Sequence, residues 1–308
     1  MHPTQTFELR VTFPGEADKV VKTKQRLIDW LLMNGVESFV EGAIDVDYNH
    51  EYGEPERDFY EEFGGDDAPL SIYRYSRESL DDLQIKIGAT FGTALSAEMH
   101  AMATETWMEG WKDSFKPFAT ARFYVAPPWE KAPAPAGLLP LIIEPGMAFG
   151  TGQHATTRLC LDQLGHIATK DAALLAGQRV LDVGTGTGIL AVGARLVGYG
   201  RCRGTDIDDD AIMAALDNAK TNKADVAFTK GSLPDGEAYD LVFANILAVV
   251  LLRIMDQLAA VVKVGGRLVL SGILVEEEDE LAISAAANGL RLVDKGQQDG
   301  WSCLVVMK

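Results

Sequence analysis

The first hundred residues switch between two hydrophobic periods. Apolar side chains recur at every second position in three segments, the period of a half-buried strand, and at steps of three and four in two others, the period of an amphipathic helix. A further apolar segment, 95–101, fits either a strand or the start of a helix. We expect strands over 6–13, 36–48 and 70–75 and helices over 17–34 and 77–91. This order, closed by one more strand, predicts a ferredoxin-like α+β module over 1–100 that serves recognition or packing.

Residues 98–115 place small and aromatic side chains at four-residue steps, which predicts one face of a helix packed against a core. We interpret residues 101–121 as a helical linker and place the domain boundary near residue 115. The Pro-rich segment 132–137 is expected to be a surface loop, since proline stiffens a chain without continuing a helix or sheet. The second domain then covers 122–308.

The second domain alternates apolar strands with amphipathic helices, as in a doubly wound α/β sheet. Two strands, 122–126 and 138–144, come first. The main sheet is predicted from strands 179–182, 202–205, 226–229, 239–244, 266–271, 290–294 and 302–307, with helices 189–198, 210–221, 247–262 and 276–288. The link between the last two strands is too short for a crossover helix, so they form an antiparallel hairpin. The predicted fold class is a seven-stranded Rossmann-like sheet with its last strand antiparallel, preceded by the small α+β domain.

The first strand of this sheet runs into a loop with glycine at alternate positions. Gly184, Gly186 and Gly188 let the backbone turn sharply and approach a ligand without a Cβ in the way. Asp206 ends the next strand, where a carboxylate accepts both hydroxyls of a ribose. Together they predict a nucleoside-containing ligand, against the alternative of an ordinary βα turn with a helix-capping acid.

Two ligand classes compete for this loop. Gly186, Gly188 and Ala191 fit the dinucleotide pattern G-x-G-x-x-G/A, which leaves an NAD-dependent oxidoreductase open. Asp182, directly before the loop, would repel a pyrophosphate at the helix N-terminus but suits a ligand with an ammonium and a sulfonium. S-adenosylmethionine has both charges and no phosphate, so the spacing and Asp182 favour it as the cofactor.

Asn245 ends a strand at the carboxyl edge of the sheet, where open α/β sheets bind ligands. Its amide can hold an acceptor nitrogen in line with a methyl–sulfur bond, and an in-line displacement gains much of its rate from such positioning. The alternative is an Asn that caps the helix beginning at residue 247. No side chain stands out as a general base.

The segment 145–157 holds three glycines and three threonines and reads as a polar loop with many backbone donors. A helix follows it, with Thr156 or Thr157 as the expected N-cap. His154 is the one histidine in this loop, and a role in ordering the loop fits its position as well as a role in the chemistry.

Composition narrows the range of partners. A net charge of −17 argues against direct nucleic-acid binding, which needs a basic surface. The three cysteines have neither metal nor redox spacing. No apolar run reaches the roughly 18 residues of a membrane span. We expect a monomeric, cytoplasmic protein with no metal site and no membrane partner.

Seven segments stand out as motifs: MAFGTGQHATT from Met147, LDVGTGTGILA from Leu181, GTDID from Gly204, NILA from Asn245, WMEGWKDSFKP from Trp107, PW from Pro128 and SGIL from Ser271. Together they resemble the ribosomal protein L-eleven methyltransferases. The Thr-rich loop joined to NILA is specific to that family, whereas the glycine loop alone is shared by most class I methyltransferases. Gln153 and Ala155 depart from the family pattern, which usually has Thr and Pro there.

The resemblance implies a class I methyltransferase fold and S-adenosylmethionine-dependent methylation of amino groups on a large-subunit ribosomal protein. The acceptors would be lysine side chains, with an α-amine as a second option. The N-terminal module would recognise the substrate and reorient over the linker. By motif position the resemblance assigns cofactor contacts to Thr157, Gly184, Asp206 and Asn245, and the predicted set is completed by Phe149, Gly150, Asp182, Gly186 and Gly188.

Other functions stay open at this point. One is a class I methyltransferase for another protein or a small amine, and another is a cofactor-binding module without catalysis. The intact Gly184, Asp206 and Asn245 argue against the module. A nucleobase or glutamine methyltransferase is disfavoured because Asn245 is followed by Ile-Leu-Ala rather than by a Pro-Pro-aromatic run.

Overall fold

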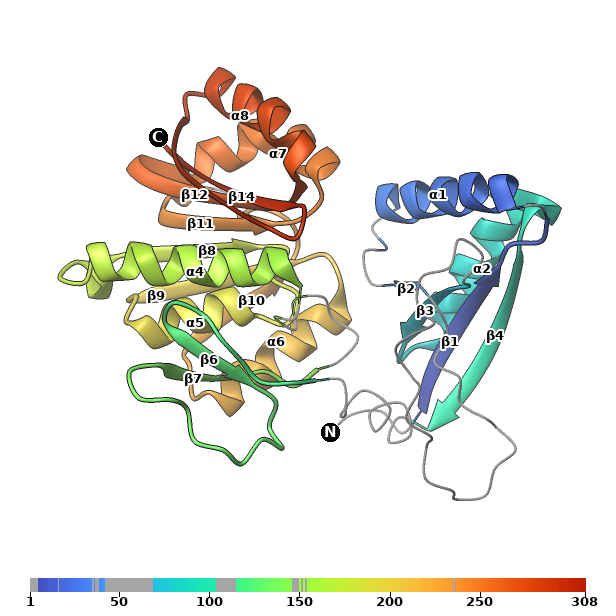
Figure 1. Cartoon of the computed structure of the whole chain (residues 1–308), viewed down its shortest axis with the longest axis horizontal. Helices are drawn as coiled ribbons and strands as arrows, with labels where there is room; N and C mark the ends of the chain where they lie inside the picture. Colours follow the sequence, from blue (N-terminus) through green and yellow to red (C-terminus); the bar gives the residue numbers. More distant parts are fainter. Residues whose placement is uncertain are drawn as a thin grey trace. The chain divides into compact units, whose positions relative to one another are not determined.

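The computed structural model describes residues 5–15, 17–34, 36, 39–41, 69–103, 115–145, 150, 152, 154–234 and 236–308. The chain divides into two compact units, Met1–Ser114 and Phe115–Lys308 (Figure 1). Each unit has a hydrophobic core of its own.

The described part of the N-terminal unit contains a four-stranded antiparallel sheet and two α-helices. Its elements are β1 (Gln5–Thr12), α1 (Ala17–Met33), β2 (Val40–Glu41), β3 (Leu70–Arg74), α2 (Arg77–Phe91), the 3₁₀ turn η1 (Gly92–Ala94) and β4 (Ser96–Ala103). Leu9 of β1, Leu27 and Leu31 of α1 and Ile87 of α2 share one core. The strand order β2-β3-β1-β4 is that of a ferredoxin-like module, as the hydrophobic pattern predicts.

The region after α2 differs from the prediction. Residues 98–103, expected to begin a helix, belong to β4, which pairs with β1 along its whole length. Ala97 and Met99 pack on the core from this strand, so the same small and apolar residues also satisfy the two-residue period of a strand. Eight residue pairs with β1 therefore outweigh the local helical pattern. The remaining residues of that expected helix, 104–114, and residues 42–48 of the expected second strand lie outside the described residues.

The C-terminal unit is built on a seven-stranded sheet in the order β10-β9-β8-β11-β12-β14-β13. Its strands are β8 (Arg179–Val183), β9 (Arg201–Asp206), β10 (Val226–Lys230), β11 (Tyr239–Asn245), β12 (Val262–Leu274), β13 (Arg291–Gln298) and β14 (Trp301–Met307). Its helices are α4 (Ala155–Lys170), η2 (Leu175–Gly177), α5 (Ile189–Val197), α6 (Asp209–Thr221), α7 (Ala248–Val261), η3 (Val275–Glu277) and α8 (Glu278–Ala287). Strand β14 runs antiparallel to both β12 and β13, which confirms the predicted terminal hairpin.

Helices cover both faces of this sheet (Figure 1). Leu241 and Phe243 of β11 share a core with α4 and α5, whereas Val242 and Ala244 share a core with α7 and α8. Neighbouring residues of a strand point to opposite faces, so a strand buried on both faces must be apolar throughout. The polar residues of β11, Asp240 and Asn245, accordingly lie near its two ends.

A small sheet in the order β5-β6-β7 precedes α4. It consists of β5 (Phe118–Ala119), β6 (Phe123–Ala126) and β7 (Leu139–Ile142), and the last two confirm the two strands predicted before the main sheet. The Pro-rich segment 132–137 forms a largely exposed loop between them. Phe123 and Leu141 are fully buried in the core with α4 and α5. Strand β7 is thus fixed in place just before the chain enters the Thr-rich segment.

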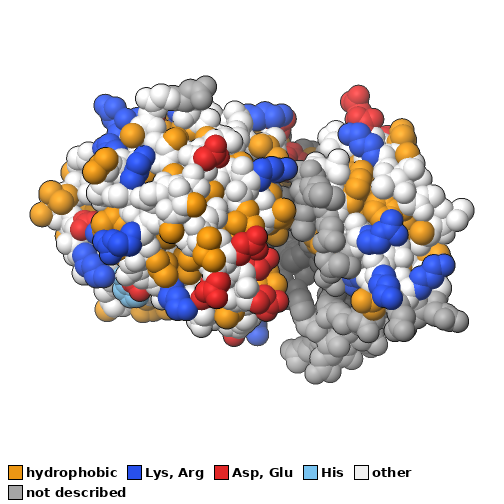
Figure 2. Space-filling view, turned by 90° about the horizontal axis from the view of Figure 1, so that it is seen from above, with side chains coloured by type: hydrophobic (Ala, Val, Ile, Leu, Met, Phe, Trp, Pro, Cys, Tyr) orange, Lys and Arg blue, Asp and Glu red, His pale blue; other side chains and the backbone are white. Residues whose placement is uncertain are grey.

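The surface carries mixed charge. On the face of the C-terminal unit in Figure 2, basic, acidic and apolar side chains are interspersed. Among the described helices, none has the length and apolar character needed to cross a membrane.

Candidate functional site

The glycine loop follows β8 at the carboxyl edge of the sheet. Gly184, Gly186 and Gly188 adopt positive φ angles of 68°, 52° and 79°. The backbone N–H groups of Gly184 and Thr185 both donate to the Thr205 carbonyl at 2.9 Å, which fastens the loop to the end of β9. A Cβ on Gly184 would overlap Cγ2 of Ile246. Position 184 therefore needs glycine both for its positive φ angle and because the side chain of Ile246, the residue after β11, lies so close.

Asp206 ends β9 beside this loop. Its Oδ2 accepts the Gly186 N–H at 2.9 Å and its Oδ1 accepts the Asp208 N–H at 3.0 Å. Burial raises the pKa of Asp206, and the hydrogen bonds from Asp208 and Gly186 oppose that rise. A carboxylate offers about four lone-pair sites, so these bonds orient Asp206 and still leave both oxygens able to accept ribose hydroxyls.

Asp182 lies behind the loop with an exposed fraction of 1%. Its Oδ2 accepts the Thr185 hydroxyl at 2.6 Å and the Ala191 N–H at 3.2 Å, whereas its Oδ1 is buried without a hydrogen-bond partner. Burial raises the pKa of Asp182 to about 7, against the lowering effect of these two donors. The carboxyl thus joins the glycine loop to the first turn of α5, and one oxygen is left without a partner.

Asn245 is the last residue of β11. Ala244 pairs with Val183, so the register brings Asn245 level with the start of the glycine loop. The alternative role as a helix cap is wrong, because the N-cap of α7 is Leu247. Instead the Asn245 Nδ2 lies 3.4 Å from Oγ1 of Thr157, and its Oδ1 is buried without a partner. The sequence-predicted residues Thr157, Gly184 and Asn245 therefore meet at one place.

The SGIL motif of β12 reaches the same place. A Cβ on Gly272 would lie 2.5 Å from the Ile246 carbonyl oxygen, so the backbones of β12 and β11 approach closely just after Asn245. The Ser271 hydroxyl donates to the Ser302 carbonyl at 2.9 Å and fastens β14 to this edge.

Helix α4 begins one turn earlier than expected. Its N-cap is His154, whose Nδ1 accepts the Thr156 N–H at 3.4 Å, and not Thr156 or Thr157. Both threonines are fully buried in the first turn, where Thr157 contacts Asn245. The His154 ring also lies edge-on to Trp301 at 4.6 Å between centroids, and burial lowers its pKa. His154 thus orders the loop.

The structure describes only part of the loop before α4. Gly150 accepts the Thr187 hydroxyl at 2.6 Å through its carbonyl oxygen, which joins this loop to the glycine loop. Phe149 and Gln153, also named from the sequence, lie outside the described residues. Residues that the sequence pattern did not indicate are Thr185, Thr187, Trp301 and Asn218, which donates to the Thr187 carbonyl at 2.9 Å.

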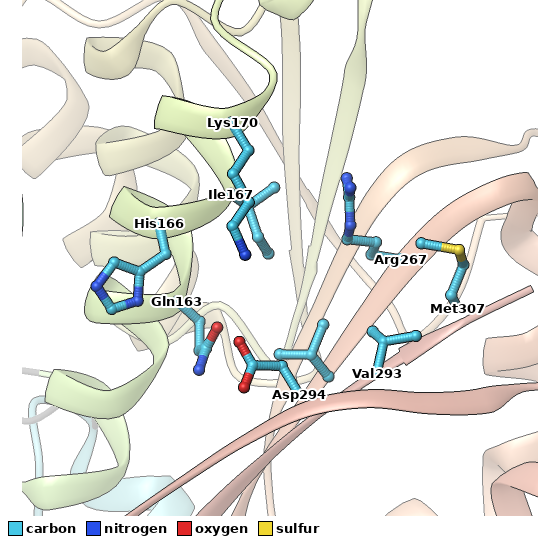
Figure 3. A pocket seen from close by; sticks show the side chains of 9 residues that line it. Gln163, His166, Ile167, Lys170, Arg267, Val293, Asp294 and Met307 are labelled. Carbon is cyan, nitrogen blue, oxygen red and sulfur yellow. The ribbon is translucent and has the colours of Figure 1, made fainter.

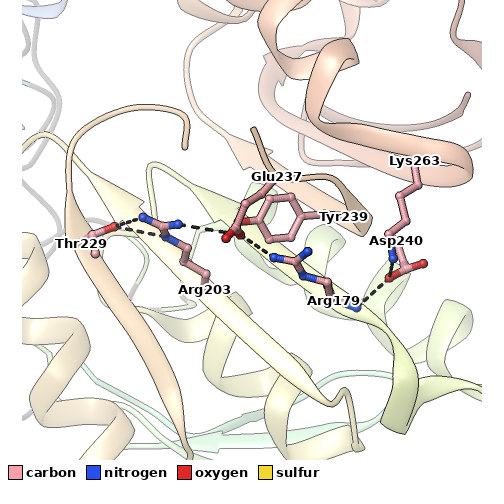
Figure 4. A network of polar contacts seen from close by, with 7 residues as sticks. All are labelled: Arg179, Arg203, Thr229, Glu237, Tyr239, Asp240 and Lys263. Carbon is pink, nitrogen blue, oxygen red and sulfur yellow. Dashed lines mark hydrogen bonds and ion pairs between the residues drawn. The ribbon is translucent and has the colours of Figure 1, made fainter. Parts of the chain in front are cut away.

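The amino ends of the same strands carry a different set of polar groups. Arg179 pairs with Glu237 at 2.5 Å, Lys263 pairs with Asp240 at 2.7 Å, and the Arg179 N–H donates to Asp240 at 2.8 Å (Figure 4). This network ties the starts of β8, β11 and β12 together. The ligand-facing groups are thereby confined to the carboxyl ends, where open α/β sheets bind ligands.

A separate cavity of about 150 Å³ lies between α4 and strands β12, β13 and β14. Gln163, His166 and Lys170 face Arg267 and Asp294 across it (Figure 3). Arg267 is already paired with Asp171 at 2.5 Å. The cavity shares no residue with the predicted site.

The strand order, the glycine loop, Asp206 at the end of β9 and Asn245 at the end of β11 together define a class I methyltransferase that uses S-adenosylmethionine. The family model of ribosomal protein L11 methyltransferase (PrmA) matches residues 22–308. The chain belongs to the ribosomal protein L11 methyltransferase family.

Individual relatives agree with this assignment. A ribosomal protein L11 methyltransferase of Syntrophotalea carbinolica is 43% identical over 219 residues, 70% of each chain. That of Geobacter metallireducens is 38% identical over 255 residues, 78% of this chain and 83% of the relative. The solved structure of a ribosomal protein L11 methylase from Lactobacillus delbrueckii subsp. bulgaricus has a TM-score of 0.57 and 30% identity, and the match covers 63% of this chain and 99% of that one.

The residues present fit S-adenosylmethionine, the cofactor of this family. Two buried oxygens, Asp182 Oδ1 and Asn245 Oδ1, have no hydrogen-bond partner among the described residues, and they lie at the ends of adjoining strands. Each can accept a hydrogen bond from an N–H or O–H group of a ligand. The cofactor ammonium and an acceptor amine are such donors. The carboxylate of Asp182 lies behind the glycine loop, where a dinucleotide would bring its pyrophosphate, so the NAD-dependent alternative is set aside.

Proposed function

We propose that this chain transfers methyl groups from S-adenosylmethionine to amino groups of ribosomal protein L11, on lysine side chains, with an α-amine as a second option. The observation that carries the proposal is that the Asn245 Oδ1 is buried beside the glycine loop with no hydrogen-bond partner among the described residues. Thr157 holds the other end of the amide, Nδ2. Support for the substrate comes from the family match and from the relatives that bear this name.

The chain's own residues would hold the cofactor in three places. Asp206 would accept the ribose hydroxyls, the N–H groups of the glycine loop would line the ligand, and Asp182 would meet its ammonium through Oδ1. When bound, S-adenosylmethionine supplies a methyl group activated by the positive sulfur. Gly150 bonds to the glycine loop and Thr157, in the first turn of α4, bonds to Asn245, so these two residues would line the site from the other side.

Asn245 would orient the acceptor. Its Oδ1 can accept one N–H of an uncharged amine, which leaves the nitrogen lone pair free to form the N–C bond as the S–C bond breaks. The methylated nitrogen then carries a positive charge and loses a proton to water, because an amide cannot act as the base. Thr157 keeps the amide in this orientation by holding its Nδ2.

The two units would divide the task. We assign substrate recognition to residues 1–100, a reorienting linker to residues 101–121, and cofactor binding and methyl transfer to residues 122–308. All the described site residues lie in the C-terminal unit, which supports this division. We further propose that the enzyme works as a monomer in the cytoplasm, without direct nucleic-acid binding.

The decisive experiment incubates the purified chain with ribosomal protein L11 and radiolabelled S-adenosylmethionine, followed by mass spectrometry of the product. Label on L11 amines is expected, and Asn245→Ala serves as the inactive control. Label in another ribosomal protein but not in L11 would overturn the substrate assignment. Binding of NAD but not of S-adenosylmethionine in calorimetry would overturn the cofactor assignment.

A further inference from the structure

Among the described strands, β6 pairs with one edge of β7 and none pairs with the other. That second edge lies against α6. Here Asn222 acts in place of a strand: its Oδ1 accepts the Ile142 N–H at 2.8 Å and its Nδ2 donates to the Ile142 carbonyl at 2.6 Å. Asn218, one turn earlier, accepts the Glu144 N–H at 2.9 Å. The two side chains satisfy backbone groups that would otherwise be unpaired at a half-buried edge.

Asn218 makes a second bond that Asn222 does not. Its Nδ2 donates to the carbonyl of Thr187 in the glycine loop at 2.9 Å, and the side chain is only 2% exposed. Thr187 in turn donates through its hydroxyl to the Gly150 carbonyl at 2.6 Å. A continuous series of hydrogen bonds therefore runs from Glu144, through Asn218 and Thr187, to Gly150.

This series connects the residue before the Thr-rich segment to a residue within it. Glu144 precedes the Thr-rich segment and Gly150 lies within it, while Thr187 stands between Gly186 and Gly188. The Asn218 amide thus sets the glycine loop and the start of the Thr-rich loop at one fixed separation. Only a side chain with both a donor and an acceptor at this length can make both bonds.

We propose that Asn218 is a positioning residue for cofactor binding, because it fixes the glycine loop against the loop that closes the site. Asn222 anchors β7 and also donates to the Asn218 backbone carbonyl at 2.8 Å, but its side chain makes no bond to the glycine loop among the described residues. The inference rests on the proposed role of the glycine loop as the seat of S-adenosylmethionine. It concerns a residue of α6, outside the motifs by which the site is identified from the sequence.

Two substitutions separate the two bonds of Asn218. Asn218→Asp keeps an acceptor for the Glu144 N–H but sets a carboxylate oxygen against the Thr187 carbonyl, whereas Asn218→Ala removes both bonds. Asn222→Ala is the matched control, since it lies on the same helix face and touches the same strand without reaching the glycine loop.

Calorimetry with S-adenosylhomocysteine is the first measurement. We expect the dissociation constant to rise about tenfold in both Asn218 variants and to stay within about twofold in Asn222→Ala. Equal weakening in all three variants, or unchanged affinity in the Asn218 variants, would overturn the inference. If the unsubstituted chain did not bind S-adenosylhomocysteine, that result would contradict the proposed function, and this inference with it.

Amide hydrogen exchange of the ligand-free protein provides a second measurement that does not depend on binding. Peptides covering residues 184–190 are expected to exchange faster in the Asn218 variants, with no change in Asn222→Ala. Uniformly faster exchange across β8, β9 and β11 would mean that Asn218 only supports the fold, and it would contradict a positioning role.

Discussion

The side-chain amide of Asn245 lies 3.4 Å from the hydroxyl of Thr157, although 88 residues separate them in sequence. The contact joins the end of β11 to the first turn of α4, and it explains why the NILA and Thr-rich motifs occur together. Thr157 is fully buried, so we expect it to affect a bound ligand through Asn245 and not by a contact of its own. The Asn245 amide is thereby held through its Nδ2, and its Oδ1 stays without a hydrogen-bond partner among the described residues.

Replacing Asn245 by alanine should abolish the positioning of the acceptor amine. We expect the rate of methyl transfer to fall by about 10²-fold, the size of effect seen when one oriented group is lost from an active site. Affinity for S-adenosylhomocysteine should change much less. Asn288→Ala, a change at the end of α8, is the control. Full activity of Asn245→Ala in a single-turnover assay would contradict this role.

Asp206 should contribute mainly to cofactor affinity. Loss of its charge-assisted hydrogen bonds in Asp206→Ala is expected to weaken binding by on the order of 1.5–3 kcal/mol. Titration calorimetry measures this directly. Asp209→Ala removes a nearby carboxylate whose side chain is 72% exposed, and it should leave the affinity unchanged. Equal affinities for the two variants would reject the ribose contact.

Asp182 should make the protein less stable as the pH rises. Its carboxyl has a pKa of about 7 in the folded chain against 3.8 as a model value, so between these values the folded state binds more protons than the unfolded one. The free energy of unfolding contributed by this group is full below pH 3.8 and is lost as the pH approaches 7. The expected loss is on the order of 4 kcal/mol.

Asp182→Asn tests this linkage because the amide stays neutral at every pH. Denaturant titrations between pH 4 and 7 should show the unsubstituted protein losing stability relative to the variant. Asp225→Asn, a change at an exposed carboxyl, should show no such difference. A constant gap between Asp182→Asn and the parent over this range would show that the carboxyl titrates normally.

Local patterns were sufficient to propose most of the candidate cofactor site. Asp206 and Asn245 were recognisable because a polar residue at the end of an apolar strand falls on the carboxyl edge of the sheet. The glycine loop was recognisable because alternate glycines have few other uses after a strand. The terminal hairpin followed from the length of one link. These features depend on residues close together in sequence.

Features that depend on tertiary contacts were missed or misassigned. The cap of α4 is His154 rather than a threonine, because Thr156 and Thr157 are drawn into the core and Thr157 bonds to Asn245. Residues 98–103 form a strand because β1 offers a paired edge. Asn218 reads as an ordinary polar residue of an amphipathic helix, and nothing local shows that its amide reaches Thr187. The sequence offered one indication, the four-residue spacing of Asn218 and Asn222, which places both on one face of the helix.

Gly184→Ala should destabilise the fold through two separable effects. The positive φ of 68° costs a residue with a Cβ about 1–2 kcal/mol. Overlap of the new Cβ with Ile246 Cγ2 adds about 1–3 kcal/mol. Adding Ile246→Ala should recover the second part only, as measured in a double-mutant cycle by chemical unfolding. Gly137→Ala, with φ of 88° and open space around the Cβ, should show the first part alone. Equal losses of unfolding free energy in Gly184→Ala and Gly137→Ala would mean that Ile246 moves away from the new Cβ at little cost. The close approach of Ile246 would then not be the reason for glycine at position 184.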